Sequence, residues 1–166
     1  HTSMNLLSLL TTQPWLFLVF VLAFLVTLAV HESSHALMGS LLGDPTAKRE
    51  GRLTLNPFAH IDVLGFLTLI TIGFGWGKPV PFNPYNLKYP RWGPAMVAAA
   101  GPFSNLFFGM VCCLAVKPLI PLLGLQNLLV QFLVYTGFLN FMLMLFNLIP
   151  IAPLDGSKAL SSLLAS

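Results

Sequence analysis

The chain is dominated by long runs of apolar residues that are separated by short polar or glycine- and proline-rich segments. The first run covers residues 14–42, starts at Pro14, a favoured first helical residue, and stops at the breaker Gly43-Asp44-Pro45. Two further runs cover residues 94–116 and 126–146. Because a helix needs roughly 20 apolar residues to cross a bilayer, this pattern predicts three spanning helices.

The segment between the first two predicted helices has a different character. Residues 52–55 (Arg-Leu-Thr-Leu) alternate polar and apolar side chains, which predicts a short strand near the membrane surface. Residues 61–74 are apolar but too few for a full crossing, which is typical of a re-entrant or interfacial segment, and residues 73–94 are expected to form a loop. The expected fold is an all-α polytopic membrane protein, whose core of three spanning helices carries a short β/re-entrant insertion between the first and the second.

Composition agrees with a bilayer as the solvent. Of the 166 residues, 56% are hydrophobic and 8% are charged, which leaves room for one domain and excludes an ordinary soluble protein. The net charge of +3 comes from so few charges that no nucleic-acid partner is expected. We expect a single core domain over residues 4–166, with residues 1–3 as a cloning remnant and Ser166 as a candidate truncation point.

The distribution of basic residues predicts an orientation. If residues 47–92 lie on one side of the membrane, most Lys and Arg residues lie there too, Lys158 returns to that side, and Lys117 faces the other way. The positive-inside rule then makes the side of residues 47–92 cytoplasmic. A crossing by residues 61–74 would export Lys78, and also Lys88 and Arg91, which the rule disfavours.

The first apolar run contains the sequence His31-Glu32-Ser33-Ser34-His35, an HExxH motif. On a helix, the i, i+4 spacing brings both imidazoles to one face, where they can bind a single Zn²⁺, and Glu32 can reach a metal-bound water. The alternative is a set of polar residues that are satisfied within a bundle without metal. Ionisable groups are costly in a spanning helix, so a functional role is favoured.

A catalytic zinc usually has three protein ligands, so a third ligand is needed. The best of the five acidic residues is Asp155, which follows the third helix after Pro150 and Pro153 break it. A surface Asp-Gly turn is the alternative interpretation. Because the first and third helices would run in the same direction, all three ligands would meet near the cytoplasmic side.

Two asparagines lie in the apolar helices. Asn105 and Asn147 are candidates for oxyanion stabilisation or substrate contact, with ordinary interhelical hydrogen bonding as the alternative. His60 and Asp62 form another conceivable ligand pair, which is disfavoured because residues at i and i+2 do not share a helix face.

The sequence resembles the site-2 protease family of intramembrane zinc metalloproteases. The resemblance rests on the HExxH motif, on Gly101-Pro102-Phe103-Ser104-Asn105, on residues 147–156 with their terminal Asp155-Gly156, and on residues 56–62 and 75–81. It implies one zinc per chain held by His31, His35 and Asp155, and Glu32 as general base. It also implies a transmembrane substrate cleaved by regulated intramembrane proteolysis in a bilayer, expected here to be a prokaryotic cell membrane.

Two rival functions come from other classes of protein. A metal transporter or channel would use intramembrane His and Asp as a permeation site, but no repeated pair of broken helices is evident. A catalytically inactive relative would bind membrane proteins without cutting them, and the intact Glu32 argues against it. The oligomeric state is left open.

Overall fold

The structure, a computed structural model, describes residues 6–152 and 154–164. The helices are α1 (Leu6–Thr12), α2 (Pro14–Leu41), α3 (Thr46–Arg49), α4 (Val63–Ile72), α5 (Gly93–Leu123), α6 (Leu128–Leu148) and α7 (Asp155–Leu164). Short 3₁₀ turns occur at Pro57–Ala59 and Pro84–Asn86.

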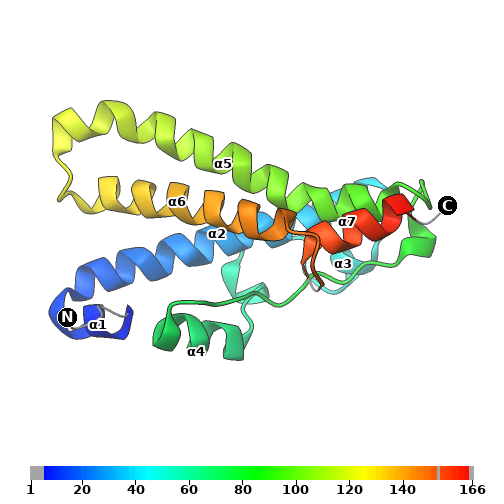
Figure 1. Ribbon diagram of the computed structural model, residues 1–166, viewed down its shortest axis with the longest axis horizontal. Helices are drawn as coiled ribbons and strands as arrows, with labels where there is room; N and C mark the ends of the chain where they lie inside the picture. Colours follow the sequence, from blue (N-terminus) through cyan, green and yellow to red (C-terminus); the bar gives the residue numbers. More distant parts are fainter. Residues whose placement is uncertain (1–5, 153, 165–166) are drawn as a thin grey trace.

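Three long helices form the body of the molecule. α2, α5 and α6 pack against one another in pairs, and each is long and apolar enough to cross a membrane. Figure 1 shows α2 and α6 running in the same direction and α5 running against them, as the sequence predicted. The expected core of three membrane-spanning helices is therefore confirmed.

α5 is longer than its apolar pattern predicted. The expected end at residue 116 was wrong, because the helix continues through Pro118 and Pro121 to Leu123 and ends at Gly124, whose φ is 78°. Each of these prolines removes one backbone hydrogen bond and crowds the carbonyl of the preceding turn, but α5 continues through both while it packs against α6.

The insertion between α2 and α5 is helical and irregular, so the predicted β/re-entrant unit was wrong. Residues 52–55 form no strand, because their backbone groups have other partners: the N–H of Arg52 donates to the carbonyl of Ala47 at 2.8 Å, and the carbonyl of Thr54 accepts from His60 Nε2 at 2.8 Å. The Arg52 guanidinium donates to the carbonyl of Lys78 in a neighbouring segment. Among the described residues, the β-type pairing is a single isolated bridge between Ile61 and Gly77. The short apolar segment forms α4, which contacts α1.

The two ends of this insertion are fastened together. The N–H of Lys88 donates to the carbonyl of Leu42 at 2.7 Å, and the N–H of Asn83 donates to Asp44 Oδ2 at 2.6 Å. The chain therefore leaves the bundle where α2 ends and returns to the same end, where α5 begins (Figure 1). Between these points it passes over α2, with Val80 beside the HExxH motif.

Candidate metal centre and catalytic cavity

The HExxH motif lies in the second half of α2. Because His31 and His35 are one helical turn apart, both rings project from one face toward the bundle interior. Their exposed fractions are 3% and 7%, and their Nε2 atoms lie 3.0 Å apart. Two buried imidazoles in an apolar bundle are costly unless they share a partner.

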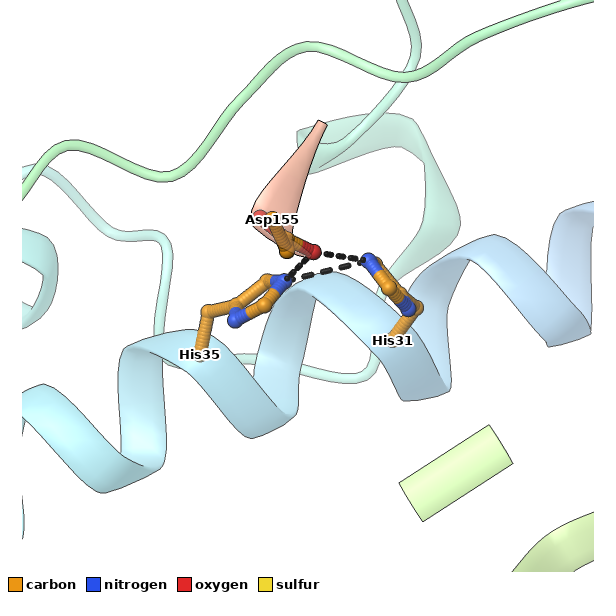
Figure 2. Close-up of side chains that lie close together, drawn as sticks. All are labelled: His31, His35 and Asp155. Carbon is orange, nitrogen blue, oxygen red and sulfur yellow. Dashed lines mark hydrogen bonds and ion pairs between the residues drawn. The ribbon is translucent and has the colours of Figure 1, made fainter. Parts of the chain in front are cut away.

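Asp155 supplies that partner from the far end of the chain. α6 ends at Leu148, and α7 begins at Asp155 itself. A Cβ on Gly156 would lie 2.7 Å from the carbonyl oxygen of Leu148, so only glycine lets α7 start this close to the end of α6. Asp155 Oδ2 lies 3.1 Å from His31 Nε2 and 3.0 Å from His35 Nε2. Figure 2 shows the three side chains pointing toward one another.

The electrostatics of the cluster favour a bound cation. His35 Nδ1 donates to the carbonyl of Val97 at 2.7 Å, and a carbonyl can only accept, so a neutral His35 has its lone pair on Nε2. Burial raises the pKa of the Asp155 carboxyl, but its contacts with His31 and His35 outweigh burial and hold that pKa well below its usual range. Lys158 Nζ lies 3.3 Å from the second oxygen, Asp155 Oδ1.

The donor set fits zinc. Among the described residues, these two histidines and one aspartate form the group that can hold a metal ion, and their ligand atoms lie within 4.8 Å of one another. Two imidazole nitrogens and one carboxylate oxygen are a ligand set of catalytic zinc, which keeps a fourth position open. Three such groups are costly to bury together in an apolar bundle unless a positive charge compensates the carboxylate, and a metal ion held by all three would supply it.

Glu32 is next to the cluster and faces a cavity. Its exposed fraction is 8%, and its Oε2 accepts a hydrogen bond of 3.2 Å from the N–H of Val80. The cavity has a volume of about 420 Å³ and contains His31, Glu32, His35 and Asp155 in its wall. The rest of the wall is largely apolar and aromatic, with Phe20, Phe24, Trp76, Phe138, Met142 and Phe146.

The two candidate asparagines lie in different places. Asn147 lines the cavity and donates from Nδ2 to the carbonyl of Leu143 at 3.0 Å. Asn105 is completely buried, and its Oδ1 lies 2.6 Å from His31 Nδ1, on the side of the ring that faces away from the cluster. The geometry thus places Asn147 in the cavity wall and Asn105 behind His31.

The disfavoured ligand pair is not assembled in the structure. His60 Nε2 donates to the carbonyl of Thr54, and the Asp62 carboxylate caps the start of α4 by accepting from the N–H of Gly65 at 2.8 Å. Both side chains therefore have structural partners of their own.

Sequence reasoning missed several groups that support the cluster. The spacing of Lys158, three residues after Asp155, is a signal that could have been used, because i, i+3 pairs are neighbours on a helix. The carbonyl of Val97 has no signal in the sequence. Gly101 was named only as part of a segment that carries the family resemblance, although a Cβ there would lie 2.5 Å from His35 Cε1 and 2.6 Å from His31 Cε1.

An HExxH helix inside a bundle of three membrane-length helices, completed by an aspartate from a later helix, defines a membrane metalloprotease. The model of peptidase family M50 matches residues 123–166. The chain is 38% identical to "Putative zinc metalloprotease YwhC" of Bacillus subtilis over 160 residues, which are 93% of this chain and 71% of the relative. It belongs to the site-2 protease family, peptidase family M50, and zinc is its cofactor.

More distant relatives carry a similar description. "Putative zinc metalloprotease Rip2" of Mycobacterium tuberculosis is 29% identical over 160 residues, which are 90% of this chain and 60% of the relative. The protein of the same name from Mycolicibacterium smegmatis is 29% identical over 158 residues, which are 87% of this chain and 56% of the relative. No solved structure matches the chain.

Proposed function

We propose that this chain is an intramembrane zinc endopeptidase that hydrolyses peptide bonds within or near transmembrane segments of membrane-protein substrates, in regulated intramembrane proteolysis. His31, His35 and Asp155 hold one zinc per chain, and Glu32 is the general base. The observation that carries the proposal is that Glu32 and all three ligands line one apolar cavity inside a bundle of membrane-length helices.

The cavity suits an apolar substrate. Its aromatic and aliphatic wall can cover the side chains of a transmembrane segment, while the polar groups gather in one part of it. A peptide bond in a helix is shielded by its own hydrogen bonds, so the substrate must unwind locally before it is cut. An extended segment that enters the cavity would bring its carbonyl between Glu32 and the ligand cluster.

The residues of the chain divide the chemistry between them. A zinc held by the two histidines and Asp155 supplies Lewis acidity. Glu32 accepts a proton from the attacking water and passes it to the leaving amine nitrogen. Asn147, which lines the cavity, contacts the substrate, and Lys158 keeps one oxygen of Asp155 engaged so that the other faces the histidines.

The domain and its orientation are part of the proposal. Residues 4–166 act as a single catalytic core domain in a prokaryotic cell membrane, and the active site lies toward the cytoplasmic side. The concentration of basic residues in the insertion between α2 and α5 supports this orientation, because both ends of the insertion meet at the end of the bundle nearer the ligands.

Substitution Glu32→Gln tests the proposal. Glutamine keeps the size of the side chain but accepts no proton, so cleavage of a transmembrane substrate should fall by about 10²- to 10⁴-fold with zinc content unchanged. The measurements are cleavage in detergent and elemental analysis of the same samples. The double variant His35→Ala, Asp155→Ala is the control and should lose zinc. Cleavage near the wild-type rate by zinc-replete Glu32→Gln protein would refute the mechanism.

A further inference from the structure

A hydrogen-bond network of buried polar side chains crosses the bundle from α6 to the cluster of His31, His35 and Asp155. Asn140 on α6 donates from Nδ2 to the carbonyl of Thr136 at 2.7 Å and to Thr27 Oγ1 on α2 at 2.9 Å. Asn105 on α5 donates from Nδ2 to Asn140 Oδ1 at 2.8 Å, and its own Oδ1 lies 2.6 Å from His31 Nδ1. Both asparagines have an exposed fraction of 0%.

The direction of every hydrogen bond in this network follows from one backbone carbonyl. The oxygen of Thr136 can only accept, so Asn140 must turn its NH₂ group toward it. The oxygen of Asn140 then faces Asn105, which must present its NH₂ group in turn. The oxygen that remains on Asn105 faces His31 Nδ1, so this nitrogen must carry the hydrogen.

We propose that Asn140 and Asn105 are positioning residues that hold His31 in the tautomer with its hydrogen on Nδ1. The lone pair of the neutral ring is then on Nε2, the atom that lies 3.1 Å from Asp155 Oδ2. The carbonyl of Val97 does the same for His35 in one step. The consequence for zinc affinity rests on the proposed role of His31 as a ligand, whereas the tautomer itself does not.

Burial makes the network selective for one tautomer of His31. The other tautomer of His31 would require both amides to reverse, which would bring the oxygen of Asn140 against the oxygen of Thr136. Without water to compensate, such a contact is costly inside an apolar bundle. A residue of α6 that does not touch the ligand cluster thus prepares a ligand on α2 before any metal arrives.

Zinc affinity, measured by competition with a chelator, tests the proposal. Asn140→Leu and Asn105→Leu should each weaken zinc binding by about 10- to 100-fold, the usual effect of losing a partner of a metal-binding histidine. The two changes together should weaken zinc binding no more than Asn105→Leu alone, because both interrupt the same hydrogen-bond network. Unchanged affinity in Asn140→Leu would overturn the proposal.

Thr136→Val is the matched control. The Thr136 hydroxyl is buried and has no hydrogen-bond partner, and valine has nearly the same shape. The substitution keeps the carbonyl that orients Asn140, one turn away on the same helix, so zinc affinity should be unchanged. A loss as large as that of Asn140→Leu would attribute both effects to packing and overturn the proposal.

The tautomer is observable without zinc. Nitrogen NMR of metal-free protein labelled at histidine, at a pH where the rings are neutral, should show His31 protonated on Nδ1 in the wild type, and lose this preference in Asn140→Leu. The signal is assigned by its absence in His31→Ala. An unprotonated Nδ1 on His31 in the wild type overturns the proposal even if no variant folds. Zinc binding that survives in His31→Ala would instead refute the proposed function.

Discussion

The absence of a side chain at Gly101 decides whether the two histidines fit. Gly101 lies on α5 opposite His31 and His35, and a Cβ at this position would overlap ring atoms of both. The rings cannot move away freely, because His31 Nδ1 is engaged by Asn105 and His35 Nδ1 by the carbonyl of Val97. The same hydrogen bonds that orient the rings therefore make the site intolerant of one added carbon.

Gly101→Ala should weaken zinc binding and reduce cleavage. Either the rings rotate out of alignment with Asp155, or α5 shifts away from α2, and overpacking of this kind costs about 1–3 kcal/mol. Chelator competition should show an affinity lower by roughly 5- to 100-fold. Gly39→Ala is the matched control on α2, since a Cβ there meets nothing within 4 Å, and it should be neutral or stabilising by up to about 1 kcal/mol. Equal zinc affinities for the two variants would contradict the steric explanation.

Asp44 is a buried carboxylate that organises the loop after α2. Its exposed fraction is 1%, and it accepts hydrogen bonds from the N–H and hydroxyl of Thr46, the side chain of Asn86 and the N–H of Asn83. Burial raises the pKa of Asp44, but these hydrogen bonds outweigh it and lower that pKa below its usual value. The ionised form therefore stabilises the folded loop.

Asp44→Asn should destabilise the protein at neutral pH by about 1–3 kcal/mol, because an NH₂ group would face a donor. A lowered folded-state pKa contributes stability above the ordinary carboxyl pKa of about 3.9, and this contribution is lost as the pH falls through the lowered value. The deficit of the variant should thus be full at pH 7 and shrink below pH ~4. Thermal unfolding in detergent at both pH values checks this, and a deficit independent of pH would argue against the ionised carboxylate.

At the scale of elements, the segment over α2 presents a single donor to Glu32, the proposed general base. Pro79 and Pro81 have no N–H, so Val80 supplies the one backbone N–H of residues 79–81, and it donates to Glu32. The residue before a proline favours an extended backbone, which keeps this N–H pointing sideways from the chain. The Pro-Val-Pro sequence thus fixes both the direction and the number of donors at Glu32.

Val80→Pro should lower kcat by about tenfold or more, because the carboxylate loses a charge-assisted hydrogen bond that holds it in place. Proline suits an extended backbone, so the segment should keep its course. Val80→Ala keeps the N–H and loses only side-chain carbons, and its kcat should stay near that of the wild type. If the two variants had the same kcat, the hydrogen bond would have no role in positioning Glu32.

The sequence predicted the long elements well and the insertion poorly. Apolar runs of membrane length are strong signals, and α2, α5 and α6 follow them. The alternation in residues 52–55 was misleading because Arg52 is buried and bonds to the carbonyl of Lys78, a contact across the insertion that no local pattern encodes. The proximity of His31, His35 and Asp155 was foreseen because the i, i+4 spacing is local and the number of membrane crossings gives the relative direction of α2 and α6. The hydrogen-bond network through Asn140 was not foreseen, because it depends on how three helices face each other.

At the scale of the whole molecule, the fastened insertion predicts that residues 43–92 have both ends on one side of the membrane. The hydrogen bond between Lys88 and Leu42 closes the insertion, and the excess of Lys and Arg should make that side cytoplasmic. α5 then carries Lys117 toward the opposite side.

Single-cysteine labelling of intact cells with an impermeant reagent tests this topology. In a background with Cys112→Ala and Cys113→Ala, the variants Lys48→Cys and Lys88→Cys should be protected, since both positions are exposed and belong to the segment that we propose to be cytoplasmic. Lys117→Cys, also at an exposed position, should be labelled from outside. Labelling of Lys48→Cys and Lys88→Cys from opposite sides would mean that the insertion crosses the membrane.

The proposed ligands come from distant parts of the chain, since His31 and Asp155 are 124 positions apart. During synthesis, all three long helices leave the ribosome before the last ligand does. A nascent chain that stops short of Asp155 has its base and two imidazoles in the bilayer but lacks the complete ligand set. Under the proposed function, proteolytic competence therefore requires synthesis to continue past Asp155, and a polypeptide interrupted before this residue should not cleave neighbouring membrane proteins.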